Sequence, residues 1–263
     1  MTKAIVGGTG IYEIPGVKTI EKTIYTQYGE ATIYVGQGDH EDLVFLTRHG
    51  TDHSIPPHKV NYRANIAALK KLNVSHVLAV YCVGSLKTML PPGGMALLDQ
   101  FIDYSMHRES TFFMGGDHGL GHTDMVQPYC PTLRNIVQKV SQRESFDILP
   151  NATYLSFNGP RFETAAEIRM FAQLGGDVIG MTGASETTLA REAGLHFAAV
   201  AYSVNYGAGL VDSSMKIEKQ GLQERLDKML SILIDSLREP FTTQCICDSA
   251  VYMSEEPKID IFS

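Results

Sequence analysis

The sequence has no apolar stretch long enough to cross a membrane. A transmembrane helix needs about 18 or more consecutive apolar residues, and no run in this chain approaches that length. The apolar residues at the N-terminus give way to glycine at Gly7, which leaves too short a segment for the apolar region of a secretory signal peptide. We therefore expect a cytoplasmic protein without a membrane partner.

Clusters of basic residues are also missing. The chain has 22 Lys and Arg against 29 Asp and Glu, which gives a formal net charge of −7. Nucleic acids and anionic membranes both favour proteins with clustered Lys and Arg. The composition therefore predicts no nucleic-acid partner, and it fits an acidic soluble enzyme.

Cysteine is scarce, with four residues in the whole chain. Cys82 and Cys130 stand alone, whereas Cys245 and Cys247 form a Cys-x-Cys pair near the C-terminus. Such a pair can form a strained disulfide or supply half of a metal site, but the sequence offers no second cysteine pair for zinc. We expect four free thiols, as is usual in a reducing compartment, and no metal.

A chain of 263 residues is long enough for one large domain. Strand patterns alternate with helical patterns along it, an order typical of the α/β class. We expect one domain over residues 1–240 and an extended tail over residues 241–263. Helices are expected at residues 60–72, 133–143, 165–174, 186–193 and 218–237.

The first strand runs into the glycine-rich turn Gly7-Gly8-Thr9-Gly10. It is not a dinucleotide-binding loop, because Glu13 stands where the third glycine is required, and it lacks the Lys-Ser/Thr end of a P-loop. The backbone here can wrap an anion, with Thr9 adding a hydroxyl, or it can be a plain tight turn. The residues alone leave both interpretations open.

Another strand, at residues 43–47, ends in Arg48-His49-Gly50. Open α/β sheets bind ligands at the carboxyl ends of their strands, and Arg with His supplies donors suited to a dianionic phosphate. His53 and His58 nearby raise the possibility of a metal site. We do not predict one, because Pro56 and Pro57 separate His58 from any helix shared with the other histidines.

Two strand-to-helix junctions follow at residues 158–164 and 180–183. In the first, a Gly-Pro turn places Glu163 in the first turn of a helix; in the second, Thr182 opens a helix after a short strand. A helix N-terminus with a hydroxyl suits an anion, and a carboxylate suits a polar heterocycle. Both junctions are also common ways to connect a strand to a helix without any role in ligand binding.

A later strand, at residues 197–204, ends in Asn205 ahead of several glycines. An amide at this position can both donate and accept hydrogen bonds. Asn205 is therefore a third candidate for contact with a ligand at the edge of the sheet.

Seven motifs in order resemble the trimeric purine nucleoside phosphorylase and methylthioadenosine phosphorylase family. The resemblance extends from residue 4 to about residue 238, which is most of the chain. The motifs are Gly7-Gly8-Thr9-Gly10, Arg48-His49-Gly50, Val60-Asn61-Tyr62-Arg63-Ala64-Asn65, Gly84-Ser85-Leu86, Asp99-Gln100-Phe101-Ile102-Asp103, Gly159-Pro160-Arg161-Phe162-Glu163-Thr164, and Gly180-Met181-Thr182 with Glu186.

The resemblance implies phosphorolysis of a nucleoside to a free purine and a ribose 1-phosphate, in a single-domain mixed β-sheet flanked by helices. No cofactor is implied, because inorganic phosphate is a co-substrate. Met181 would lie under the ribose, and His122 would reach into a neighbouring site, which implies a homotrimer. Phosphate would be held by Thr9, Arg48, His49 and Thr182, with the backbone at Cys82 as a further donor.

The base site departs from the methylthioadenosine-cleaving members of the family. Those members carry a small hydroxyl residue in place of Glu163 and aspartates in place of Asn205 and Gly207. Glu163 with Asn205 is the pair of the enzymes that cleave 6-oxopurine nucleosides, and Phe162 is implied to line the base. An ionised carboxylate only accepts, so it can pair with the N1–H of hypoxanthine but not with the bare N1 of adenine. Asn205 is placed to donate to N7 of the leaving purine.

The residues expected around the 5′ end of the sugar suggest that the substrate carries a methylthio group there. Inosine and guanosine phosphorylases of the family place a histidine near the 5′-hydroxyl, and this chain has no histidine after His196. Instead, the segment that would cover this end offers the apolar side chains of Leu210, Val211, Met215 and Ile217. These side chains can equally pack the last helix onto the sheet.

Three hypotheses result. The first is a phosphorylase that prefers 5′-methylthioinosine. The second is a 5′-methylthioadenosine phosphorylase or a general inosine and guanosine phosphorylase. The third is a non-catalytic purine or phosphate binder, which would have no need of the complete set Arg48, His49, Thr182 and His122.

Overall fold

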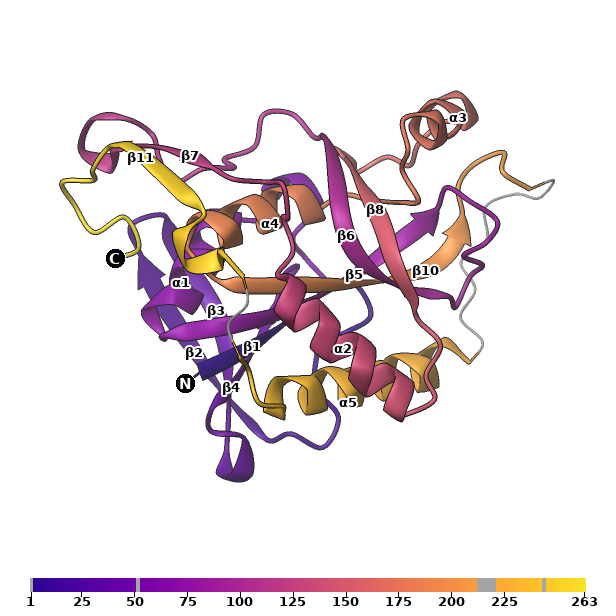
Figure 1. The fold of residues 1–263 in the computed structure, drawn as a ribbon, viewed down its shortest axis with the longest axis horizontal. Helices are drawn as coiled ribbons and strands as arrows, with labels where there is room; N and C mark the ends of the chain where they lie inside the picture. The colour runs from indigo at the N-terminus through magenta and orange to yellow at the C-terminus, as the bar shows by residue number, and fades with distance from the viewer. Residues whose placement is uncertain (1, 51–52, 212–220, 243–244) are drawn as a thin grey trace.

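The computed structural model describes residues 2–50, 53–211, 221–242 and 245–263. In this part of the chain, nine strands form one mixed sheet in the order β10-β6-β8-β9-β5-β1-β4-β3-β2 (Figure 1). They are β1 (Thr2–Gly7), β2 (Thr19–Thr26), β3 (Gly29–Gly36), β4 (Leu43–Thr47), β5 (Val74–Ser85), β6 (Met95–Tyr104), β8 (Leu149–Phe157), β9 (Val178–Gly180) and β10 (His196–Tyr206).

One half of the sheet closes on itself. β10 pairs with β5 as well as with β6, so the strands β5, β10, β6, β8 and β9 form a ring. β5 and β10 run parallel from His76 opposite His196 to Ser85 opposite Tyr206, and both are buried at most positions. Strands buried on both faces read as continuous apolar runs, which is how both appear in the sequence.

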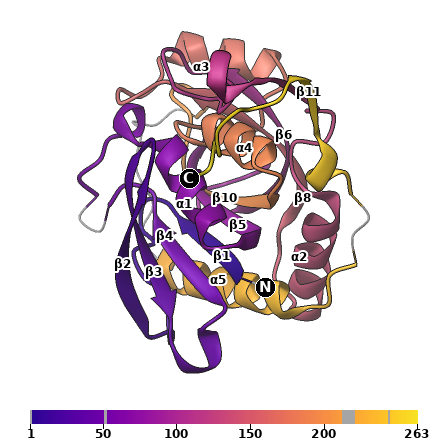
Figure 2. The ribbon, with the colours of Figure 1, turned by 90° about the vertical axis from the view of Figure 1, so that its left-hand side faces the viewer.

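Among the described residues, five α-helices lie around the sheet. They are α1 (Tyr62–Lys71), α2 (Pro131–Arg143), α3 (Ala165–Gln173), α4 (Gly183–Glu192) and α5 (Leu222–Arg238). α2 and α5 lie side by side over one face, while α1 and α4 cover the other (Figures 1 and 2). Short 3-10 helices occupy Gly38–His40 (η1), Pro57–Lys59 (η2), Gly116–His118 (η3) and Cys247–Ser249 (η4).

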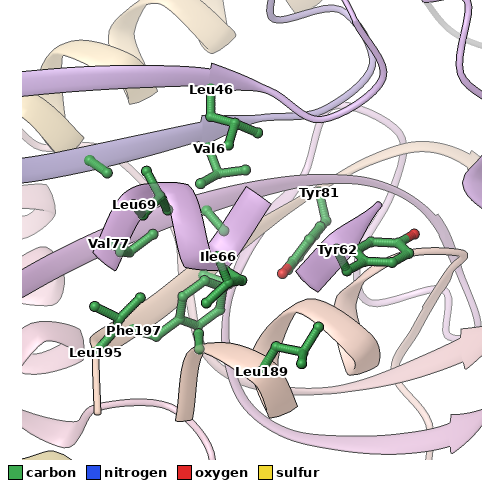
Figure 3. Packing of buried hydrophobic residues seen from close by; sticks show 14 of the residues in the cluster. Val6, Leu46, Tyr62, Ile66, Leu69, Val77, Tyr81, Leu189, Leu195 and Phe197 are labelled. Atoms are coloured by element: carbon green, nitrogen blue, oxygen red, sulfur yellow. The ribbon is translucent and has the colours of Figure 1, made fainter. Parts of the chain in front are cut away.

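The alternation of side chains along β1 divides the core between the two faces. Ile5 packs with the α2 and α5 side, whereas Ala4 and Val6 pack with the α1 and α4 side, as expected for a strand whose successive side chains point to opposite faces. Figure 3 shows part of the second cluster, where Ile66 of α1 lies beside Phe197 of β10.

The predicted α/β class with a mixed sheet flanked by helices is confirmed, and no described helix is long and apolar enough to span a membrane. Helix ends differ by a few residues from the expectation. The helix predicted from residue 60 begins at Tyr62 because Asn61 caps it, its side chain accepting a hydrogen bond from the backbone of Ala64 at 3.1 Å.

The residues described after residue 240, predicted as an extended tail, pack against the rest of the domain. β11 (Val251–Glu255) pairs antiparallel with β7 (Leu120–Thr123), and Ile261 is buried. The Tyr28 hydroxyl donates to the Ile261 carbonyl at 2.9 Å, and Phe262 packs edge-on against Phe112 with ring centroids 5.0 Å apart. A short apolar segment of this kind has no periodic pattern that would predict its contacts.

Candidate active site

A cavity of about 320 Å³ opens at the carboxyl ends of β1, β4, β5 and β10. Of the residues predicted to bind phosphate, base or ribose, all except His122 line it: Thr9, Arg48, His49, Cys82, Phe162, Glu163, Met181, Thr182 and Asn205. A larger hollow of about 560 Å³ lies beside Asp147 and Arg225, but it gathers no comparable set of polar side chains. Residues from distant parts of the sequence meet here because the strands that precede them are neighbours in the sheet.

Arg48 is the most deeply buried charge in the cavity wall, at 2% exposure. Its Nε and Nη2 donate to the two carboxylate oxygens of Glu186 at 2.8 and 2.7 Å, and the Tyr81 hydroxyl donates to the same carboxylate at 2.8 Å. Burial lowers the pKa of the guanidinium, but the Glu186 carboxylate raises it more, so the net pKa lies above its ordinary value. Arg48 therefore stays charged.

This pairing changes what Arg48 can offer a ligand. Glu186 occupies the side of the guanidinium formed by Nε and Nη2, so Nη1 and the second hydrogen of Nη2 are the donors left for a phosphate. The remaining nitrogen, Nη1, donates to the Val80 carbonyl at 3.2 Å and lies against Gly8. A Cβ at Gly8 would meet Nη1 at 2.8 Å, so glycine is required there for the guanidinium to approach the backbone.

His49 enters the cavity as a neutral ring. Its Nδ1 lies 2.8 Å from the Ile55 carbonyl oxygen, which can only accept, so Nδ1 carries the proton and Nε2 is left as an acceptor. Burial, together with the charge of Arg48, lowers the pKa of His49 to about 4. His49 therefore donates from Nε2 only if a ligand induces its protonation.

The turn from β9 into α4 is shaped by Tyr154. Its hydroxyl accepts hydrogen bonds from the backbone of Thr182 at 3.1 Å and Gly183 at 3.2 Å. A Cβ at Gly180 or Gly183 would meet the Tyr154 side chain at 2.3 or 2.8 Å. Two backbone donors at the helix start are thus already used, which corrects the expectation that they face an anion. Thr182 sits at the N-cap position, yet its side chain makes no capping hydrogen bond.

Glu163 lies before its helix and not in the first turn, which corrects the prediction. The N-cap is Thr164, whose hydroxyl accepts from the Glu167 backbone at 3.2 Å, while the Glu167 carboxylate accepts from the Thr164 backbone at 2.7 Å. This capping box leaves the Glu163 side chain to the cavity, where burial raises its pKa above the usual range. Phe162 beside it is 52% exposed.

Asn205 is near the end of β10 and almost fully buried. One hydrogen of its amide nitrogen is used by the Tyr206 carbonyl at 2.8 Å, which fixes the orientation of the side chain. Gly84 on β5 allows this approach, since a Cβ there would stand 3.3 Å from the amide nitrogen. The second N–H and the amide oxygen remain to be offered to a ligand.

His122 is the predicted site residue that the cavity does not include. It lies exposed on β7, opposite Tyr252 of β11. Of the histidines considered for a metal, His49 and His53 line the cavity, whereas His58 lies in η2. Leu210 and Val211 are not among the lining residues, and the predicted contacts of Met215 and Ile217 lie outside the described residues.

Sequence reasoning missed three residues that hold the site together. In the sequence, Glu186 stands out only as part of a motif, and no pattern marks Tyr154 or Arg108. Arg108 donates to the Met181 carbonyl at 2.5 Å and to the Asn158 carbonyl at 2.9 Å, so it ties the two junctions to each other. Glu186 lies in the first turn of α4, a helix that also carries serine, threonine and other charged side chains, so no sequence pattern distinguishes it.

The model of the family described as the phosphorylase superfamily matches residues 2–237. The 6-oxopurine nucleoside phosphorylase of Pyrococcus furiosus is 40% identical over 94% of this chain and 97% of its own. A probable S-methyl-5′-thioinosine phosphorylase of Methanocaldococcus jannaschii is 40% identical over 94% of this chain and 96% of its own. Among solved structures, a double mutant of adenosine/methylthioadenosine phosphorylase from Schistosoma mansoni in complex with adenine has a TM-score of 0.80 at 31% identity, covering 90% of this chain and 92% of its own.

Proposed function

This chain belongs to the phosphorylase superfamily, and from that premise we propose that it cleaves purine nucleosides with phosphate and prefers 5′-methylthioinosine. The family resemblance predicted from the seven motifs is thereby confirmed. The products are a free purine and 5-methylthioribose 1-phosphate. Relatives named as acting on 6-oxopurine nucleosides and on S-methyl-5′-thioinosine, each 40% identical over most of the chain, support this reaction.

One observation carries the substrate class: Glu163 and Asn205 line the same cavity as Arg48, His49 and Thr182. The first two match the edge of a 6-oxopurine, and the others supply donors and charge for a phosphate. The cavity of about 320 Å³ is within the usual size of small-molecule sites.

In the reaction, a phosphate oxygen forms a bond to the anomeric carbon of the ribose as the bond from that carbon to the purine breaks. The electron pair of the broken bond moves onto the purine, and the sugar passes through a state with positive charge. The bound phosphate is both the nucleophile and the counter-charge to that sugar, so positioning and electrostatics supply most of the rate. Asn205 donates to N7 and stabilises the charge on the leaving base.

The phosphate ligands are Thr9, the free side of Arg48, Thr182 and the backbone at Cys82, together with His49, which donates from Nε2 once the bound anion favours its protonated form. We assign Met181 to the ribose and its 5′-substituent. His122 is exposed on β7, as a residue that reaches into the site of a neighbouring subunit in a homotrimer must be. No cofactor takes part.

A second candidate is a 5′-methylthioadenosine phosphorylase. The structural neighbours include Schistosoma mansoni enzymes in complex with adenine and with methylthioadenosine, at 31% identity. Against this candidate, Glu163 would face adenine N1 with an acceptor. A buried mismatch of this kind can reject the wrong analogue by about 10⁴-fold.

The test is a panel of four nucleosides with phosphate: methylthioinosine, inosine, methylthioadenosine and adenosine, with kcat/KM measured from release of free base. We expect methylthioinosine to exceed inosine by about tenfold or more, which corresponds to about 1.4 kcal/mol, and both to exceed the 6-amino nucleosides far more strongly. Equal activity on methylthioadenosine would reject the role of Glu163. Equal activity on inosine would leave a general inosine phosphorylase, and no release of base would reject the enzyme.

A further inference from the structure

Four side chains that bind metals well meet at the end of β10 opposite Asn205. Cys130 caps α2, His196 is the first residue of β10, and Cys245 and Cys247 lie in the C-terminal segment. Their three sulfur atoms and the histidine nitrogen all lie within 4.8 Å of one another. All four cysteines belong to the described residues, and none is disulfide-bonded.

The spacing of these atoms matches a tetrahedral metal site. Zinc bonds of about 2.3 Å to sulfur and about 2.0 Å to nitrogen place tetrahedral ligands about 3.8 Å apart for two sulfurs and about 3.5 Å apart for sulfur and nitrogen. Cys130 Sγ is 3.7 Å from Cys245 Sγ, and His196 Nδ1 is 3.8 and 3.3 Å from these two sulfurs. A disulfide would need sulfurs about 2.05 Å apart.

The surroundings orient the histidine as a metal ligand. While Nδ1 of His196 faces the sulfurs, Nε2 lies 3.6 Å from a carboxylate oxygen of Asp248. A ligating histidine almost always directs its other nitrogen to a carboxylate, a carbonyl or water. The ring is also packed against His76 and Phe241, with centroids 4.9 and 4.6 Å away.

Charge gives an independent reason to expect a ligand here. Arg191 is buried at 2% exposure and donates to Cys247 Sγ at 3.2 Å and to the Asp124 carbonyl. None of the ion pairs among the described residues includes Arg191, and its Nη2 has no hydrogen-bond partner there. A buried cation needs a counter-charge. Three thiolates and a divalent cation carry a net charge of −1, which Arg191 balances.

We propose that Cys130, His196, Cys245 and Cys247 bind one zinc ion in a closed tetrahedral site. Four protein ligands leave no open position, so the role of the ion is structural. It fastens the C-terminal segment to α2 and β10. That segment continues into β11, which pairs with β7 beside His122, so the ion also supports the strand that carries this residue. The inference does not depend on the proposed function.

The test is the zinc content of the protein, expressed without a histidine tag, purified under reducing conditions and measured by mass spectrometry of the elements. We expect about one zinc ion per chain. Cys130→Ser and Cys247→Ser should lose it, whereas Cys82→Ser, which changes the cysteine outside the cluster, should retain it. Asp248→Asn should keep the ligands and weaken zinc binding by about 10- to 100-fold.

A second measurement covers the case in which the serine variants fail to fold. Zinc is removed from the unmodified protein by a chelator and replaced by Co²⁺, which should show thiolate charge-transfer bands and the d–d bands of a tetrahedral ion. Removal should also lower the melting temperature, with recovery on adding zinc but not magnesium. A folded, reduced protein that takes up neither metal would overturn the proposal, and so would an unchanged zinc content in both serine variants. A disulfide within the cluster would also overturn it if the protein still bound no zinc after that disulfide was reduced.

Discussion

The two sets of residues that line the cavity differ in how firmly they are held. Arg48 is fixed by two hydrogen bonds to Glu186, and the turn at Thr182 is fixed by Tyr154, all in buried surroundings. Phe162 and Glu163 instead stand on the loop before α3, and Phe162 is half exposed. A rigid set suits the step that is common to every nucleoside, whereas a loop can change the base preference without disturbing the core.

The difference follows from where each set lies in the fold. Arg48 directly follows β4, which lies between β1 and β3 in the sheet, and Glu186 of α4 holds its guanidinium. The loop before α3 is held at its two ends, by Arg108 on Asn158 and by the capping box at Thr164. We therefore expect substitutions in the rigid set to lower activity on all substrates, and substitutions in the loop to alter selectivity.

The largest effect should come from Arg48→Ala. It removes the buried cation beside the glycine turn, and loss of one preorganised donor lowers kcat by about 10²- to 10³-fold. The loss should be similar for 6-oxo and 6-amino nucleosides, because Arg48 is assigned to phosphate. Steady-state kinetics with varied phosphate measures it.

The same change leaves Glu186 as an unpaired buried charge, which costs about 3 to 5 kcal/mol of stability. Thermal unfolding must therefore accompany the kinetics, and Arg48→Lys is the matched variant that keeps the charge but loses the fork. An Arg48→Ala enzyme with unchanged kcat and unchanged KM for phosphate would contradict the assignment.

A smaller and selective effect is expected from Glu163→Gln. The new amide can donate to adenine N1, which the carboxylate cannot, so the ratio of 6-oxo to 6-amino activity should fall by about 10²-fold. Stability should change by less than about 0.5 kcal/mol, since a side chain in a loop away from core packing contributes little. The ratio of kcat/KM values for methylthioinosine and methylthioadenosine measures it.

Glu167→Gln is the control for that experiment. Glu167 lies four residues further on, in the capping box, and is paired with Arg161 at 2.7 Å. Its loss should reduce stability by about 0.3 to 1.5 kcal/mol and leave the base ratio as it is. If both variants shift the ratio equally, the loop acts through its conformation and not through the Glu163 carboxylate.

The smallest effect concerns pH and compares a histidine inside the cavity with one outside it. The pKa of His49 is about 4 in the folded protein, below the ordinary value near 6.5, and that of His76 is lowered to about 4, mainly by burial. Between about pH 4 and pH 6.5 the unfolded chain binds more protons than the folded protein. The stabilising contribution is therefore complete above about pH 6.5 and is lost as the pH falls toward 4.

Denaturant unfolding from pH 4 to pH 7 measures how the free energy of unfolding changes with pH. In His49→Asn or in His76→Asn, the slope of this change should decrease by at most about 1.4 kcal/mol per pH unit. Phosphate should reduce the dependence that His49 contributes, because a bound anion favours the charged ring, and should leave that of His76 unchanged. An effect of phosphate that persists in His49→Asn would assign it to another group.

The sequence alone was sufficient to identify those cavity-lining residues that directly follow strands. Thr9, Arg48 and Asn205 each stand near the end of an apolar run, and parallel strands with aligned carboxyl ends bring such positions to one edge of a sheet. Thr182 also follows an apolar run, but β9 is antiparallel to β5 and pairs with the last residues of that strand. The α/β class followed from the alternation of patterns. The position of Glu163 was wrong by two residues, because Thr164 with Glu167 forms a better cap than the Gly-Pro turn suggested.

Only the tertiary structure decided which side chains pair across the chain. Glu186 lies 138 residues from the Arg48 that it binds, and Cys130 is 115 residues from Cys245. Local periodicity records which face of an element is buried, but it carries no information about which distant element covers that face. Contacts of this kind depend on the packing of the whole sheet, which is why the partner of Arg48, the order in the C-terminal segment and the thiol cluster could not be predicted.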